Sequence, residues 1–358
     1  MSTPTAPAVR SRVAVTAAYA AQGLGYAVVV TSLPVFKDRQ GIDDVGVSLI
    51  VLLVCVTAAL GSVTADFLAK WRGSRIALVV GLCLEVVALL LIVVSVVVPG
   101  LPLWVFVAAF GIYGLGLGGV DAGGAMQGVL VQRRYGRDIM GGYFAAYTAA
   151  AIVGALSVAG SSAAGVAVLL PLSFAALVAL IVAVFGLRAF DPARAATPVG
   201  GRSRGPLPRR GIWLFGFVIL AAFTVDSAVS TWSTVYLQDE LLAAAAYPAA
   251  AIAGFALAGV AVGALVPLAF TSAGGLAPAR SDEIIARVNL FNYVGAVLGA
   301  VLLGLLADAP GLGIAFLLPA ALLVPVLFVA RRFRAPVAAD TALLSVVSDG
   351  DAPASVDR

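Results

Sequence analysis

Charged residues are scarce in this sequence, and histidine is absent. Lys, Arg, Asp and Glu make up 11% of the 358 residues, whereas a soluble domain carries roughly a quarter. So few charges cannot cover a water-exposed surface, which excludes a soluble globular protein. The lack of histidine removes the commonest acid–base and metal-binding side chain. The two cysteines, Cys55 and Cys83, stand inside apolar runs, so we expect packing roles for them and neither a metal site nor a cofactor.

Long apolar runs dominate the chain instead. A helix that rises about 1.5 Å per residue needs about 20 apolar residues to cross a hydrocarbon core of about 30 Å. These runs are rich in Ala, Leu and Gly and lack hairpin turns at ten-residue spacing, which excludes a lipid-facing β-barrel. We therefore predict an all-α membrane protein of about ten transmembrane helices. The ten segments are 13–36, 45–69, 75–98, 103–131, 140–162, 166–188, 211–238, 247–272, 284–307 and 311–331.

The positions of Lys and Arg predict the orientation, because these residues concentrate on the cytoplasmic side of a membrane. When successive gaps are assigned alternately to the two sides, 20 of the 22 cations fall on one side, and Lys37 and Arg39 fall on the other. We expect the first side to be cytoplasmic and to hold both termini, in a cytoplasmic (inner) membrane. The net charge of +4 then reflects topology, and no nucleic-acid partner is expected.

Composition divides the chain into five parts. The stretch from Asp191 to Gly211 is rich in Pro, Gly and Arg, which is typical of a flexible basic linker. It separates six predicted helices from four. The parts are a cytoplasmic N-terminus (1–12), an N-terminal six-helix bundle (13–190), the basic cytoplasmic linker (191–211), a C-terminal four-helix bundle (212–333) and a disordered cytoplasmic tail (334–358).

Three acidic residues stand inside the predicted membrane segments: Glu85, Asp121 and Asp226. A charged group at membrane depth costs at least about 2.5–3.5 kcal/mol on insertion scales, so an intramembrane acid is a functional candidate by default. Counting along the helices places all three roughly 14–21 Å from the cytoplasmic end, near the midplane where secondary transporters bind substrate and coupling ions. We therefore predict proton-coupling roles for Asp226 and Asp121, while Glu85 has an equally good structural explanation.

Polar side chains are aligned on three of the predicted helices. Tyr19, Gln22 and Tyr26 share one face of the first helix, and similar stripes occur in the seventh and ninth. A water-filled central cavity would need such stripes, although Ser, Thr, Asn and Gln also serve structural contacts between membrane helices. The expected substrate-binding residues are Tyr19, Gln22, Tyr26, Gln127, Ser230, Ser233, Asn289, Asn292 and Tyr293.

The fourth segment is dense in glycine. Gly114, Gly116 and Gly119 satisfy the G-x-G-x-x-G pattern, but no strand precedes them, so a dinucleotide fold is rejected. The same segment contains the G-x-x-x-G pairs that let membrane helices approach closely, and the fifth segment repeats the device at Gly142 and Gly154 with alanines between. Close helix packing is the predicted use. The pairs in the fourth segment are Gly114/Gly118, Gly119/Gly123 and Gly124/Gly128.

The residues also resemble a known family. The run Gly114-Leu-Gly-Leu-Gly-Gly-Val-Asp121, followed by Gln132-Arg-Arg-Tyr-Gly-Arg137, looks like the fourth helix of the major facilitator superfamily in its fucose-permease-like branch, and Ala20 to Tyr26 resembles that branch's first helix. The resemblance covers about 15–190 and 212–333. It departs from the pattern at Ala125, where the branch usually has Asn, and in an eroded loop signature between the second and third helices.

The largest departure is length. The superfamily usually has twelve helices, yet the run from Gly254 to Phe270 looks like its tenth helix and follows the seventh directly. An eighth and ninth helix are therefore expected to be missing, a loss that keeps the direction of every remaining helix. Two classes stay open: a secondary transporter of a small sugar-like or drug-like solute, for which the resemblance implies proton coupling, and a non-transporting membrane subunit or sensor with a protein partner. No nucleophile–base pair or metal set indicates an enzyme.

Overall fold

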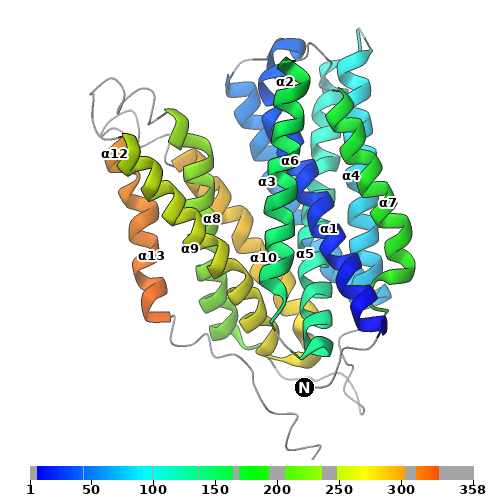
Figure 1. The fold of residues 1–358 in the computed structure, drawn as a ribbon, viewed down its shortest axis with the longest axis vertical. Helices are drawn as coiled ribbons and strands as arrows, with labels where there is room; N and C mark the ends of the chain where they lie inside the picture. Colours follow the sequence, from blue (N-terminus) through cyan, green and yellow to red (C-terminus); the bar gives the residue numbers. More distant parts are fainter. Residues whose placement is uncertain are drawn as a thin grey trace, which may run out of the picture.

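The protein is described here by a computed structural model that defines residues 6–42, 44–98, 100–136, 138–163, 169–192, 206–235, 248–302 and 312–329. These residues form helices and short connections, and no strand occurs among them (Figure 1). The helices of the N-terminal half are α1 (Ala6–Thr31), α2 (Leu33–Gln40), α3 (Asp44–Arg72), α4 (Ser74–Val97), α5 (Leu103–Tyr135), α6 (Met140–Ala163) and α7 (Leu169–Ala189). Those of the C-terminal half are α8 (Arg209–Val235), α9 (Pro248–Gly275), α10 (Ser281–Val297), α12 (Leu312–Ala315) and α13 (Leu317–Val329), with a 3-10 turn η2 (Pro278–Arg280) before α10 and a π-helical segment η3 (Leu298–Leu302) after it.

About ten membrane crossings are present, as the apolar runs predict. In the described residues, eight helices are long and apolar enough to cross a bilayer. The ninth crossing is α10 with its continuation η3, and the tenth is the apolar stretch Gly313–Val329. The predicted segment 284–307 lies partly outside the described residues, as do the linker residues 193–205 and the tail from 330 onward.

Two boundaries differ from the prediction. The first crossing begins at Ala6 and ends at Thr31, and a separate short helix, α2, occupies the part of segment 13–36 that follows. Pro34 stands in the first turn of α2, where its missing N–H costs no hydrogen bond. Gly41 ends α2 with φ 63°, a left-handed conformation that glycine adopts without strain. The last crossing is interrupted at Phe316, between α12 and α13.

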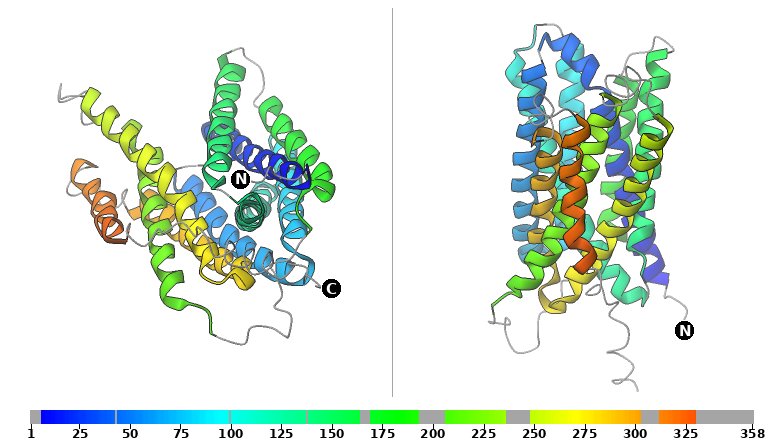
Figure 2. Two further views of the ribbon diagram at one scale, coloured as in Figure 1. Left: turned by 60° about the horizontal axis from the view of Figure 1, so that its bottom comes forward. Right: turned by 90° about the vertical axis from the view of Figure 1, so that its left-hand side faces the viewer.

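The helices form two halves that lie side by side. Helices α1 to α7 make one half and α8 to α13 the other, with α13 on its outer side (Figures 1 and 2). The marked N-terminus lies at one end of the bundle and α2, which carries Lys37 and Arg39, at the opposite end (Figure 1). Lys37 and Arg39 thus lie at the end opposite the N-terminus, while the assignment of the N-terminal end to the cytoplasm stays a prediction.

Helix α5 is the central helix of the N-terminal half, and its glycine pairs each face a different neighbour. A Cβ at Gly114 or Gly118 would collide with backbone atoms of α3, and one at Gly119 or Gly123 would collide with or crowd the backbone of α4. The third pair faces side chains of α1 and α6. The prediction of close packing is therefore confirmed for α5. In α6, Gly154 packs closely on α1, but Gly142 meets nothing within 4 Å.

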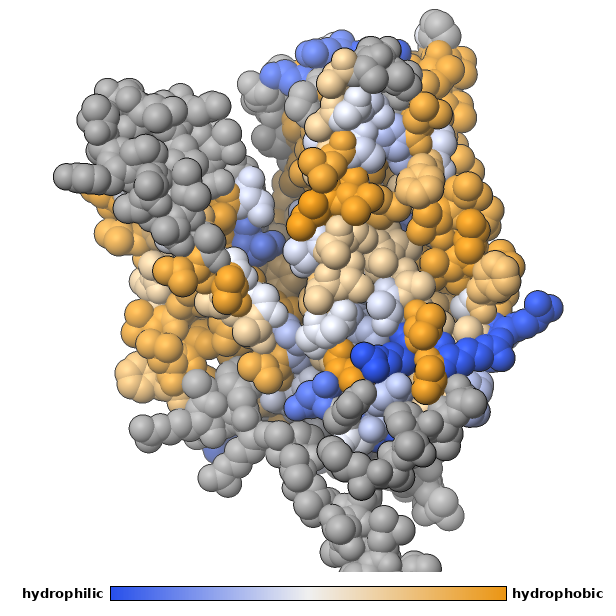
Figure 3. All heavy atoms as spheres, viewed as in Figure 1, coloured by the Kyte–Doolittle hydropathy of each residue, from blue (hydrophilic) through white to orange (hydrophobic). Residues whose placement is uncertain are grey.

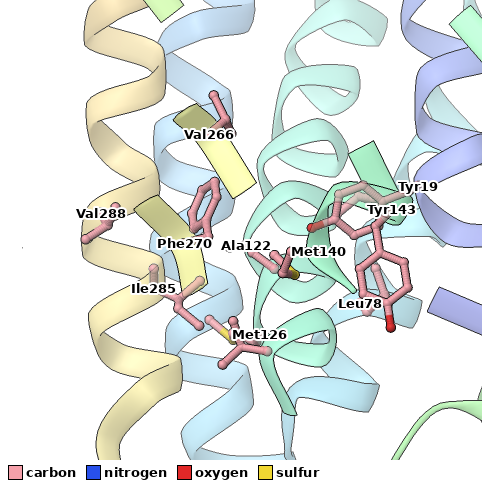
Figure 4. Packing of buried hydrophobic residues seen from close by; sticks show 14 of the residues in the cluster. Tyr19, Leu78, Ala122, Met126, Met140, Tyr143, Val266, Phe270, Ile285 and Val288 are labelled. Atoms are coloured by element: carbon pink, nitrogen blue, oxygen red, sulfur yellow. The ribbon is translucent and has the colours of Figure 1, made fainter. Parts of the chain in front are cut away.

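A continuous apolar core joins the halves toward the end that holds the N-terminus. Met126 of α5, Phe270 of α9 and Ile285 of α10 belong to one buried cluster (Figure 4). Phe270 also stacks on Phe144 of α6 with ring centroids 6.2 Å apart. Toward the α2 end the halves separate, and a cleft opens between them (Figure 3). The fold thus presents a closed end and an open end.

Candidate functional site

Asp121 lies where helices from the two halves meet. Its Oδ1 accepts a hydrogen bond from the side-chain amide of Gln22 on α1. Its Oδ2 accepts hydrogen bonds from the Tyr293 hydroxyl at 2.7 Å and from Nδ2 of Asn292 at 3.4 Å, both on α10. The Asp121 carboxylate therefore connects α5 to α1 within its own half and to α10 in the other half. Three of these residues were predicted substrate contacts from separate helix stripes.

The network continues along α10 toward the closed end. Nδ2 of Asn289 donates to the Tyr293 hydroxyl at 3.2 Å and to Oγ of Ser62 on α3 at 3.3 Å. The Ser62 hydroxyl in turn donates to the backbone oxygen of Ala286 at 3.4 Å. Ser62 and Asn289 are both buried. Their polar side-chain atoms therefore rely on these hydrogen bonds in place of hydrogen bonds to water. Ser62 was not among the predicted site residues.

Asp226 of α8 has no hydrogen-bond or ionic partner among the described residues, and its side chain is exposed. In the opposite half, Tyr26 belongs to α1 and Tyr147 to α6. Tyr26 is 41% exposed, and its ring centroid lies 6.4 Å from that of Tyr147.

Glu85 is buried on α4, within electrostatic reach of Asp121 and Tyr113. Its Cγ packs on α5 at Gly116, where an added Cβ would lie 2.9 Å away. The hydroxyl of Tyr113 is buried and has no hydrogen-bond partner in the described part of the chain. Glu85 is therefore not remote from Asp121, although the two share no hydrogen bond in the described residues.

The other predicted residues have different surroundings. The Tyr19 ring is buried and stacks on Tyr143, with centroids 5.5 Å apart. Gln127 does not join the Asp121 network: its amide donates to Ser74 Oγ at 2.9 Å and pairs with the backbone of Asp191 at the end of α7. These hydrogen bonds join α5 to α4 and to the end of α7, while the substrate role of Gln127 stays a prediction. Ser230 is exposed on α8, and the side chain of Ser233 lies outside the described residues.

Polar contacts between the halves close the end that holds the N-terminus. The Arg133 guanidinium of α5 donates to the backbone oxygens of Pro278, at 3.0 Å, and Gly274. Gln132 donates to the Thr271 hydroxyl at 3.2 Å. Lys70 of α3 approaches Glu283 of α10 at 3.8 Å. Sequence reasoning used these cations for topology and did not identify them as contacts between the halves, because their acceptors lie more than 130 residues away along the chain.

Comparison with known proteins gives a consistent result. No family profile matches the chain. It is 26% identical to an uncharacterised transporter of the major facilitator type from Yersinia pestis, over 91% of this chain and 96% of that protein. In solved structures, the fucose transporter FucP in its outward conformation superposes with a TM-score of 0.66, covering 90% of this chain and 98% of FucP at 13% identity. The chain is thus similar to a transporter of the major facilitator type and has the fold of FucP.

Two further solved structures share the fold of this chain. One is the Escherichia coli fucose:proton symporter FucP as a variant, with a TM-score of 0.64 at 13% identity over 90% of this chain and 98% of that one. The other is the human organic anion transporter TETRAN, with a TM-score of 0.62 at 12% identity over 89% and 100%. All three of these structures are of transporters.

The chain is shorter than the structures it matches. The alignment with the Yersinia protein spans 385 positions, whereas 91% of the 358 residues is about 326, so roughly 59 aligned positions have no residue here. Two transmembrane helices with their connections need about that many residues. The arithmetic agrees with the predicted loss of two crossings.

Proposed function

We propose that the protein is a proton-coupled secondary transporter of a small organic solute, sugar-like or drug-like, which binds in the cleft between the halves. Asp121 and Asp226 are the coupling carboxylates, with Glu85 as a third acid beside Asp121. The observation that carries the proposal is the set of three hydrogen bonds on Asp121, because they come from both halves of the bundle.

The protonation state of Asp121 decides how many of these bonds can persist. A carboxylate has only acceptors, and it can receive hydrogen bonds from Gln22, Asn292 and Tyr293 at once. A carboxylic acid has an O–H donor on one oxygen and less acceptor capacity. Since bonds to a charged acceptor are roughly twice as strong as neutral ones, protonation also weakens those that remain. A proton on Asp121 therefore loosens the connection between α5 and α10.

This loosening supplies the link between a proton and a conformational change. Alternating access in secondary transporters is largely a rocking of one half against the other around a fixed site. If the proton favours the rearranged state, the rearranged state favours the proton by the same factor. A solute that contacts Gln22, Asn292 or Tyr293 changes the same equilibrium, because it competes for the same hydrogen-bonding groups.

The orientation belongs to the proposal as well. We assign the end that holds the N-terminus to the cytoplasm, because 20 of the 22 cations are expected on that side. The cleft of Figure 3 then opens to the outside, and the contacts of Arg133, Gln132 and Lys70 close the cytoplasmic end.

The second candidate is a non-transporting membrane subunit or sensor. It is favoured by the roughly 59 aligned positions that this chain lacks. It predicts a stable protein partner and no solute movement. A single reconstitution experiment separates the two candidates, since a transporter needs no partner.

The test uses the purified full chain in proteoliposomes with an imposed proton gradient and labelled L-fucose, tetraphenylphosphonium and p-aminohippurate as neutral, cationic and anionic probes. We expect accumulation of at least one probe, which a protonophore abolishes. Asp121→Asn and Asp226→Asn are expected to lose gradient-driven accumulation. Asp38→Asn, which makes the same chemical change at an exposed position on α2, is expected to behave as the parent. Accumulation undiminished in both site variants at equal reconstitution would refute the coupling roles.

A further inference from the structure

Three arginines lie around the end of α7 without an ionic partner among the described residues. Arg10 is in the second turn of α1, Arg75 in the first turn of α4 and Arg188 in the last turn of α7. Arg10 and Arg188 are exposed, and Arg75 is partly exposed. We call these three residues the arginine cluster. Other cations at the same end donate to a carboxylate or a backbone oxygen, among them Lys70, Arg133, Arg134, Arg280 and Arg287.

A hydrogen bond joins the start of α1 to the end of α7. Oγ of Ser11 donates to the backbone oxygen of Ala189 at 3.0 Å, and Ser11 is buried. Ser11 directly follows Arg10, and Ala189 directly follows Arg188. Each of the two arginines is thus one residue away from the same hydrogen bond, so their backbone positions are close together in space.

Further hydrogen bonds join the end of α7 to the start of α4. The side chain of Gln127 accepts from the backbone N–H of Asp191 at 3.0 Å and donates to its backbone oxygen at 3.1 Å. The same side chain donates to Oγ of Ser74, the residue before Arg75, at 2.9 Å. The carboxylate of Asp191 pairs with Arg134 at 2.8 Å. The acid at this junction is therefore already neutralised and does not balance the arginine cluster.

Helix electrostatics do not account for the arginine cluster. The start of a helix is the positive end of its dipole and disfavours a cation there, yet Arg75 and Arg10 stand near the starts of α4 and α1. Of the other described acids at this end of the N-terminal half, Asp66 pairs with Lys70, and Asp138 forms no ion pair. Three like charges on neighbouring helix ends repel one another, so an anion from outside the protein would stabilise them.

The surface next to the arginine cluster is apolar. On α7, Arg188 continues one helix face of exposed apolar side chains, formed by Leu177, Ile181 and Val184. On α1, Val13 is exposed one turn after Arg10. On the side of α1 and α7, hydrophilic surface lies next to hydrophobic surface (Figure 3). Cations above an apolar helix face are suited to a ligand with an anionic head and hydrocarbon chains.

We propose that the arginine cluster binds the phosphodiester headgroup of an anionic phospholipid, whose acyl chains lie along the exposed face of α7. Guanidinium groups bind phosphate oxygens through paired, charge-assisted hydrogen bonds, and basic pockets between membrane helices bind anionic headgroups. A zwitterionic headgroup carries its own cation, which the three arginines repel. A free phosphate matches the charge but makes no use of the apolar face. The site lies at the closed end and outside the cleft, so it goes beyond the proposed function and does not depend on it.

The test is native mass spectrometry of the purified full chain in a neutral detergent, titrated with dioleoyl phosphatidylglycerol or dioleoyl phosphatidylethanolamine. We expect phosphatidylglycerol to bind saturably and phosphatidylethanolamine to bind at least tenfold more weakly. The combined variant Arg10→Gln, Arg75→Gln, Arg188→Gln is expected to weaken phosphatidylglycerol binding at least tenfold. Replacing the same three residues by Lys keeps the charge and should bind within a few-fold of the parent. Monodisperse elution and an unchanged Tm in lipid-free detergent confirm that each variant is folded.

The matched control removes three other cations from the same end of the bundle. Arg72, Arg209 and Arg210 are exposed and form no ion pair in the described residues, so their combined replacement by Gln changes the net charge equally. This control variant should bind phosphatidylglycerol as the parent does, which separates a defined site from general attraction between charges.

Several outcomes would overturn the proposal. They are equal binding of the two lipids, an equal loss of binding in the site and control variants, and no saturable binding by the folded parent. Displacement of phosphatidylglycerol by an equal concentration of glycerol 1-phosphate would show a site for free phosphate esters and would overturn the assignment to a lipid. No transport measurement enters the test, so its failure leaves the proposed function intact, and a failure to transport any probe leaves the lipid site intact.

Discussion

The hydrogen bond from Tyr293 to Asp121 gives a quantitative test of how the two halves are held together. The donor and acceptor oxygens are 2.7 Å apart and belong to α10 and α5. A hydrogen bond to a charged group contributes about 1.5–3 kcal/mol. If the bond is present when the N-terminal end is closed and lost when that end opens, Tyr293→Phe moves the equilibrium toward the open form by about tenfold to hundredfold, since about 1.4 kcal/mol corresponds to tenfold.

The assay measures how often the closed end opens. Ile285 is fully buried at that end, so a cysteine placed there reacts with a maleimide only after the halves separate. The parent carries Ile285→Cys with both native cysteines replaced by alanine, and the Tyr293→Phe variant is expected to react about ten to a hundred times faster.

Tyr113→Phe is the matched control, because it removes a buried hydroxyl that has no partner in the described residues. Its reaction rate should equal that of the parent. Equal rates for Tyr293→Phe and Tyr113→Phe would refute the reasoning, since the Asp121 bond would then contribute equally to both conformations. A fall in Tm common to both variants would point to packing and not to the hydrogen bond.

Three further predictions concern topology, packing and the third acid. A cysteine at Ser203 should be protected from an impermeant thiol reagent in intact cells while one at Gln238 is labelled, and equal labelling would contradict the charge-based orientation. Gly118→Ala should lower the Tm in detergent by several degrees or prevent folding because its Cβ would strike the α3 backbone, whereas Gly142→Ala, which meets open space, should be neutral or stabilising by about 0.5–1 kcal/mol. Glu85→Gln should reduce gradient-driven accumulation less than Asp121→Asn does, because Glu85 shares no hydrogen bond with Asp121; an equal loss would place both acids in one coupling unit.

The membrane fold could be predicted because each crossing must satisfy the same local requirement. A helix in hydrocarbon needs about 20 apolar residues wherever it packs, so the ten runs were visible without knowledge of their neighbours. The close packing at the glycine pairs of α5 could be predicted for a similar reason, since small residues spaced four apart create one flat helix face. Which helix each face contacts depended on the arrangement of the whole bundle.

The candidate site was predictable in part. The stripe on α1 and the stripe on α10 pointed to polar faces, and the structure brings Gln22 and Asn292 together on Asp121. Periodicity could not show that Ser62 bonds Asn289, because the two residues are 227 positions apart. It also could not distinguish Gln127 from Gln22, because the two have the same residue type but Gln127 pairs with the backbone at Asp191. The sequence gives the chemistry of each side chain but not the residue with which it forms a hydrogen bond.

The shortened C-terminal half retains the groups that connect it to the other half. Two partners of Asp121 are on α10, and the acceptors of Arg133 lie at the end of α9 and just beyond it. On α6, Ile152, Val153 and Leu156 are each more than half exposed. In a bilayer this apolar face meets lipid tails at little cost. The shortened chain therefore keeps the hydrogen bonds by which Asp121 connects the two halves, which the proposed coupling requires.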